Sequence, residues 1–144
     1  MNTLRIGRAS AIVATFVVMG PVIGLFTVAI CSFFAVGLSN GFDGAWAIPA
    51  FLMIYGWLFA HLMGALPALV AGTLIAAYAM RFGRVPLWVG ATSGLASALL
   101  LSAIGGYGLE FNGEGLSNSA VRAIWLATHI VAATTCTAMT RGWQ

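Results

Sequence analysis

Hydrophobic residues occur along the chain in four long runs that are separated by short polar breaks. The runs cover about residues 9–38, 46–80, 86–106 and 119–140. An apolar stretch of about 20 residues is long enough to cross the hydrocarbon core of a bilayer as a helix. The breaks are rich in glycine, asparagine and charged residues, which favour turns. The pattern predicts an all-α integral membrane protein, with residues 1–144 forming one domain of four transmembrane helices in an antiparallel bundle.

Small residues recur at every fourth position of the second span. The row consists of Gly56, Ala60, Gly64, Ala68, Gly72 and Ala76, and Gly90 and Gly94 form a similar row in the third span. Because lipid gives apolar side chains no reason to prefer one another, small residues that let backbones approach mark helix contacts in membranes. We therefore predict that these residues pack helices together. Such a row drifts by about 40° per step, so we expect the longer row to contact both the first and the third span.

Two prolines fall inside predicted spans. Pro21 follows Gly20 in the first span, and Pro67 lies in the middle of the second. Each proline removes a backbone donor, so each should bend its helix. A bend at Pro67 would serve either as a gate or as a packing adjustment, and the frequency of proline in membrane helices favours the second interpretation.

The composition excludes a soluble globular protein. Of the 144 residues 61% are apolar and 6% are charged, whereas soluble domains carry roughly 25% charged residues. The arginines are too scattered for a nucleic-acid-binding patch. The first apolar run is also much longer than the roughly 7–15 residues of a signal-peptide core. Lysine is absent and glycine is abundant, which points to a GC-rich bacterial genome and hence to the bacterial inner membrane.

The distribution of charge predicts the orientation. On one side of a four-span chain lie Arg5, Arg8, Arg81, Arg84 and Arg141; on the other lie Asp43, Glu110, Glu114 and Arg122. Arginine-rich connections stay in the cytoplasm by the positive-inside rule. We therefore predict a multi-pass protein with both termini in the cytoplasm.

Two histidines, His61 and His129, lie inside the predicted spans, and titratable groups within a membrane are candidates for function. The sharpest hypothesis is one b-type haem bound by both. His61 lies 20 residues before Arg81, however, and His129 lies 12 residues before Arg141, which implies a difference in depth of about 12 Å. We therefore disfavour haem, predict no cofactor, and expect each histidine to hydrogen-bond a neighbouring carbonyl or hydroxyl group.

Other candidate chemistry is sparse. Cys31 and Cys136 form neither a CxxC motif nor a metal-binding spacing. The acidic segment 109–115 offers carboxylates that could hold a cation with Asp43, but it lacks the ligand spacing of an EF-hand and is better interpreted as a solvated loop. The sequence contains no phosphate loop and no HExxH motif. We predict neither a metal site nor an enzyme.

Two classes of function remain open. The first is a non-catalytic membrane protein that acts by association, as an accessory subunit, an assembly factor or a homo-oligomer, with the bilayer and another membrane protein as partners. The second is a small transporter or channel for a neutral or weakly charged solute, using His61, His129 and the Pro67 bend. A dry, filled bundle would favour the first class, and a water-accessible pocket lined by both histidines would favour the second.

Overall fold

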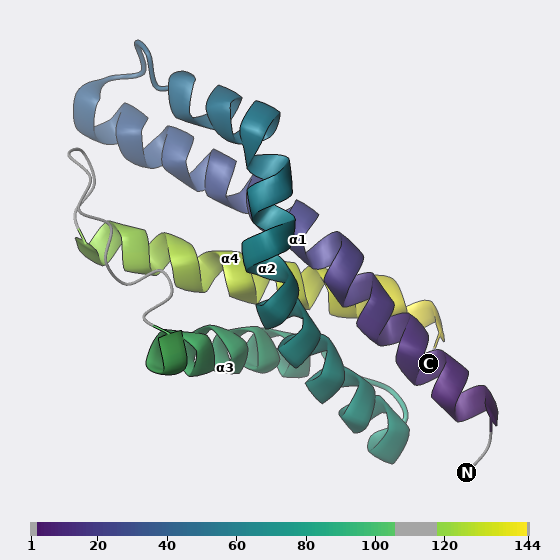
Figure 1. Ribbon diagram of the computed structural model, residues 1–144. Coiled ribbons are helices and arrows are strands. Elements are labelled where there is room, and N and C mark those ends of the chain that lie inside the picture. Colours follow the sequence, from purple (N-terminus) through teal and green to yellow (C-terminus); the bar gives the residue numbers. More distant parts are fainter. Residues whose placement is uncertain (1–2, 106–117, 144) are drawn as a thin grey trace.

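The computed structural model describes residues 3–105 and 118–143, and this part of the chain is helical except for short connections (Figure 1). Four α-helices, α1 (Thr3–Asn40), α2 (Ala47–Phe82), α3 (Leu87–Gly105) and α4 (Asn118–Thr140), are followed by a short 3-10 helix, η1 (Arg141–Trp143). All four α-helices are long and apolar enough to cross a membrane. The predicted acidic segment with Glu110 and Glu114 lies outside the described residues.

Glycines in left-handed backbone conformations end the first two helices. Gly41 and Gly44, with φ of 85° and 82°, form the turn between α1 and α2. Gly83, with φ of 79°, follows α2, and its N–H group donates a hydrogen bond to the carbonyl oxygen of Ala79 at 2.9 Å. Glycine adopts these values without the steric cost that a Cβ atom would bring. The polar breaks of the sequence thus stop the helices by backbone geometry.

The first two helices are longer than a membrane crossing requires. α1 has 38 residues and α2 has 36, so each extends over roughly 55 Å, against a hydrocarbon core of about 30 Å. α2 changes direction along its length (Figure 1). Pro67 lies inside this helix and removes one of its backbone hydrogen bonds.

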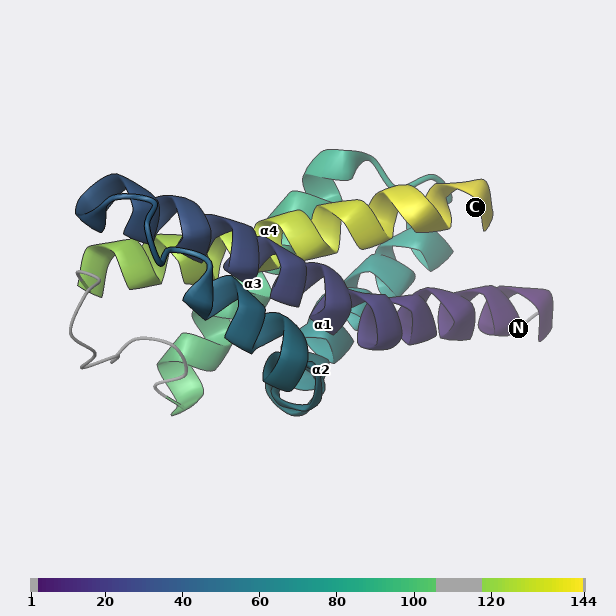
Figure 2. The same cartoon turned by 90° about the horizontal axis from the view of Figure 1, so that it is seen from above.

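α1 is the central helix of the arrangement. It packs extensively against α2 and α4, while α3 packs mainly against α4. Seen from above, α1 and α4 lie next to each other, with α3 and the second half of α2 behind them (Figure 2). α2 touches α3 less extensively and α4 hardly at all, so the side of the molecule between α2 and α4 is loosely filled.

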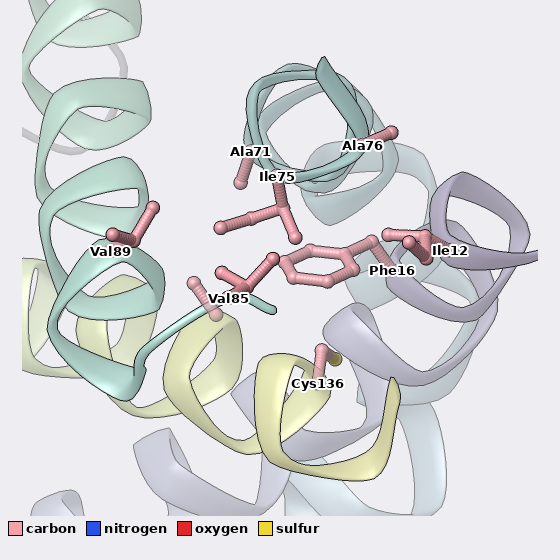
Figure 3. Close-up of a cluster of buried hydrophobic side chains, with 9 residues drawn as sticks. Ile12, Phe16, Ala71, Ile75, Ala76, Val85, Val89 and Cys136 are labelled. Atoms are coloured by element: carbon pink, nitrogen blue, oxygen red, sulfur yellow. The ribbon is translucent and has the colours of Figure 1, made fainter. Parts of the chain in front are cut away.

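A dense hydrophobic cluster fills the end of the molecule at which both chain termini lie, and we call this region the packed end (Figures 1 and 3). All four helices and the α2–α3 connection contribute to it through Ile12, Phe16, Ala71, Ile75, Ala76, Val85, Val89, Ala133 and Cys136. The ring of Phe16 lies between Ile75 and Val85 (Figure 3). Arg141 closes this end, because its Nε group donates a hydrogen bond to the carbonyl oxygen of Val85 at 3.3 Å.

The glycines of the α2 row all face α1. A Cβ atom built on each would lie 2.9 Å from Leu25 Cδ1 for Gly56, 3.3 Å from Pro21 Cβ for Gly64, and 2.8 Å from Phe16 Cβ for Gly72. We expected the row to be divided between two neighbours. Instead, the three glycines of the row all lie against α1.

The row of α3 lies against α4. A Cβ atom at Gly90 would lie 2.9 Å from Thr137 Cβ, and one at Gly94 would meet the carbonyl oxygen of His129 and the Cβ atom of Ala133. The glycines of both rows therefore face helices of the same chain.

Candidate functional site

A cavity of about 430 Å³ lies mainly between α1, α2 and α4, with Ser97 of α3 also in its wall, next to the packed end. Its wall on α1 includes Gly20, Pro21, Gly24 and Leu25; that on α2 includes Phe59, Ala60, Met63, Gly64, Pro67 and Ala68; that on α4 includes Trp125, Thr128, His129 and Ala132. Small side chains occur in the wall on all three helices. The cavity exists because these small residues face one another where the helices diverge, and no large side chain from any helix fills the space.

The cavity opens to the side of the molecule along the first half of α2. Phe59 and Met63 belong to its wall, yet 63% and 52% of their surface is exposed. The first half of α2 packs against α1 and is separated from α4, which leaves this gap. The four helices are long and apolar enough to cross a membrane, and in that setting the exposed flank of α2 borders lipid. An apolar molecule could therefore enter sideways from the bilayer.

At the other extremity the cavity is closed by the packed end. Phe16, Ala71 and Ala133 belong both to the cavity wall and to the packed cluster. Phe16 is only 1% exposed, and its ring fills the space between the helices (Figure 3). The cavity is therefore a lateral recess, and the packed end separates it from the chain termini.

The hydroxyl groups in the wall are hydrogen-bonded to their own helices. Ser97 donates to the carbonyl oxygen of Gly94 at 2.8 Å, and Thr128 donates to that of Ile124 at 2.7 Å. Their protons are thus not available to a molecule in the cavity. A solute with several polar groups would lose its hydration here without equivalent compensation, so the wall suits hydrocarbon.

His129 is fixed in the wall by Trp125, one helical turn earlier. Its Nδ1 atom lies 2.9 Å from the carbonyl oxygen of Trp125, and the two ring centroids are 4.2 Å apart at an angle of 55°. A carbonyl oxygen can only accept a hydrogen bond, so Nδ1 carries the proton, and Nε2 of the neutral ring is an acceptor. Within residues 3–105 and 118–143, no hydrogen-bond partner of Nε2 is found.

The indole nitrogen of Trp125 is the one fully buried polar side-chain atom without a partner in the described part of the chain. Trp125 lies between the cavity and a smaller hollow of about 70 Å³ that Leu62, Leu66 and Leu101 help to line. Buried donors of this kind are uncommon in folded proteins. The nitrogen itself lies beneath the cavity surface.

His61 has the same local geometry as His129 but a different environment. Its Nδ1 atom lies 3.0 Å from the carbonyl oxygen of Trp57, and the ring centroids are 5.0 Å apart. His61 is not part of the cavity wall, so the structure does not bring the two histidines together in one site. Trp-Leu-x-x-His therefore occurs twice, at 57–61 and 125–129, a repeat that the sequence analysis missed although it can be read directly.

The depth argument applied to the histidines is not supported by the contacts. Gly56 and Gly64, on either side of His61, face Leu25 and Pro21, and Thr128 lies against Gly24. Both histidines thus lie beside the same turn of α1, within roughly 6 Å along its axis. Because α2 is longer than α4 and bent, residue counts from Arg81 and Arg141 do not measure depth. The absence of a cofactor stays a prediction.

The remaining predicted residues are distributed between the two regions of the bundle. Ala60 and Ala68 line the cavity, whereas Ala76 belongs to the packed cluster. Cys31 and Cys136 are free thiols on different helices. Among the described residues, no three His, Cys, Asp or Glu side chains are grouped so that they could hold a metal ion.

Comparison with protein-family models, with curated proteins and with solved structures finds no match. The class of protein is therefore inferred from the structure alone. The described chain is all-helical, with four helices compatible with a membrane protein.

Proposed function

We propose that this chain is a non-catalytic integral membrane protein that binds the hydrocarbon chain of a lipid-soluble ligand in the lateral cavity. The observation that carries the proposal is a recess of about 430 Å³ with an almost entirely apolar wall and a side opening at Phe59 and Met63. Small-molecule sites usually measure 300–1,000 Å³ and are lined mainly by apolar groups. The sequence predicted a protein that acts by association, and in this proposal its partner is a lipid.

Two observations favour lipid binding over passage of a neutral or weakly charged solute. The packed end blocks the recess at Phe16, and His61 is not part of its wall. A polar pathway that uses both histidines therefore has no support. Pro67 instead belongs to the apolar wall of the recess.

The size of the recess also argues against a partner helix as its occupant. An α-helix with side chains is about 10 Å wide and rises 5.4 Å per turn, so a single turn occupies roughly 400 Å³. One turn would fill the recess, which is too short for a spanning helix. The glycine rows are likewise occupied by α1 and α4. Accessory-subunit and homo-oligomer roles remain predictions that neither feature supports.

Photolabelling tests lipid binding directly. A photoactivatable fatty acid added to the purified protein in mild detergent should label the peptides that line the recess on α1, α2 and α4. Ala132 is a half-buried wall residue, and Ala138 is an exposed residue of the same helix. We expect Ala132→Phe to fill the recess and abolish this labelling, while Ala138→Phe leaves it unchanged. Labelling that is spread over all exposed helix faces and insensitive to Ala132→Phe would contradict the proposal.

We further propose an antiparallel bundle in a bacterial cytoplasmic membrane with both termini in the cytoplasm. The exposed Arg8, Arg81, Arg84 and Arg141 support this orientation, since Arg81 and Arg84 flank the connection at the end that carries the termini, whereas Asp43 lies in the α1–α2 turn. The positive-inside rule places the arginine-rich end in the cytoplasm. A cytoplasmic reporter fused after Gln144 and a periplasmic reporter inserted at Asn112 should both be active. Activity of the opposite pair would refute the orientation.

A further inference from the structure

We infer that the ligand of the recess is a lipid alcohol, whose hydroxyl group donates a hydrogen bond to Nε2 of His129. This inference rests on the proposed lipid binding and adds the chemical group by which the site would recognise its ligand. The hydrocarbon chain would occupy the apolar recess. The hydroxyl group would meet Nε2 of His129, a wall residue whose Nδ1 atom is already engaged by Trp125.

The orientation of His129 is set before any ligand arrives. Nδ1 is engaged by the carbonyl oxygen of Trp125 at 2.9 Å, and the indole ring packs against the imidazole ring at 4.2 Å between centroids. These two contacts hold the imidazole ring in place and make Nε2 the acceptor atom. A ligand therefore gains the hydrogen bond without having to order the ring, a cost that reduces affinity at flexible sites.

The wall accepts a hydrogen bond but offers no proton at its surface. The hydroxyl protons of Ser97 and Thr128 are donated to backbone carbonyl groups. The indole N–H group of Trp125 has no partner, but it is buried beneath the surface. A ligand that carries only acceptors, such as an ether or an ester, would therefore find no donor within the described wall. A hydroxyl group would be matched, and its desolvation would be compensated.

Three probes of equal chain length separate the contributions: 1-hexadecanol, its methyl ether and hexadecane, each competing with the photoactivatable fatty acid for the recess. We expect the alcohol to compete about 2- to 12-fold better than the ether, which is the range of a single net hydrogen bond. His129→Leu should reduce this ratio to about one while hexadecane still competes. His61→Leu is the matched control, since His61 has the same Trp-Leu-x-x-His setting outside the recess, and it should leave the ratio unchanged.

The outcomes distinguish this inference from the proposed function. Equal competition by the alcohol and the ether in the wild type would overturn the lipid-alcohol assignment and leave lipid binding intact. A ratio that persists in His129→Leu would likewise overturn the role of His129. Failure of all three probes to compete would overturn lipid binding itself. If His129→Leu does not fold, the wild-type comparison of alcohol and ether decides on the ligand class.

Discussion

The packed end and the lateral cavity are built from similar helix surfaces, yet one is filled and the other is hollow. At the packed end the large side chains of Phe16, Ile75 and Val85 turn inward and are at most 1% exposed. At the cavity the inward positions are mostly small, while Phe59 and Met63 are largely exposed. In water such a hollow would expose apolar surface at a high cost. In a bilayer apolar side chains gain little from one another over lipid, so a recess that a hydrocarbon chain can fill is tolerated.

Phe16→Ala tests this comparison with the largest expected effect, because Phe16 both fills the packed end and closes the cavity. Loss of a buried phenylalanine side chain typically lowers the free energy of unfolding by about 3–5 kcal/mol. We expect a decrease of this size in a denaturation titration of the detergent-solubilised protein. Phe26→Ala, on the same helix at a position that is 48% exposed, should have a much smaller effect. Equal losses in the two variants would show that the packed end is no better filled than the lipid-facing surface.

Gly94→Ala and Gly24→Ala form the second test, with a smaller expected effect. The added methyl group at Gly94 would lie 2.8 Å from Ala133 Cβ and would also meet the backbone carbonyl oxygen of His129. The backbone cannot yield easily, so we expect a loss of about 1–3 kcal/mol, as for other overpacked sites. At Gly24 the nearest atom is Thr128 Cγ2 at 3.3 Å, beside the cavity. There a shift of a few tenths of an ångström by one methyl group beside the cavity relieves the contact, so we expect a smaller loss than at Gly94, below about 1 kcal/mol.

Thermal unfolding of both glycine variants in the same detergent provides the measurement. A Gly24 variant that is as unstable as the Gly94 variant would mean that the helices around the cavity are as rigidly apposed as α3 and α4. The contrast between a filled region and a hollow one would then be wrong.

Much of the fold could be predicted because lipid imposes a strict length requirement on apolar helices. The predicted second span, 46–80, corresponds to α2 at Ala47–Phe82. The larger deviation is at the start of α1, which begins at Thr3 although the apolar run begins at residue 9. The prediction started the first span just after Arg8. A charged residue, however, marks only the limit of the hydrophobic stretch and not the start of the helix. The backbone hydrogen bonds of the helix can continue beyond it into the interface.

The site could not be predicted in the same way. Residue spacing defines a face of a helix but not the neighbour that covers it. For the row with Gly64 we expected both the first and the third span, whereas its glycines lie against α1 alone, and for Gly94 the sequence indicated no particular neighbour. The cavity arises because the helix backbones diverge and the side chains that face it from several helices are too small to fill the space. A local sequence pattern describes one helix at a time, so it does not predict such a cavity. The repeated Trp-Leu-x-x-His motif was readable. Only the structure, however, separates His129 in the wall from His61 outside it.

The composition of the packed end has a consequence for how the protein is made. Ala133 and Cys136 supply the contribution of α4 to this cluster, and Arg141 closes it from η1. During synthesis, α1, α2 and α3 precede these residues along the chain and leave the ribosome before α4 does. Until then, Gly90 and Gly94 lack the helix that covers them. The cluster is therefore completed only once α4 is in place, and a chain truncated before α4 would leave the glycine face of α3 uncovered.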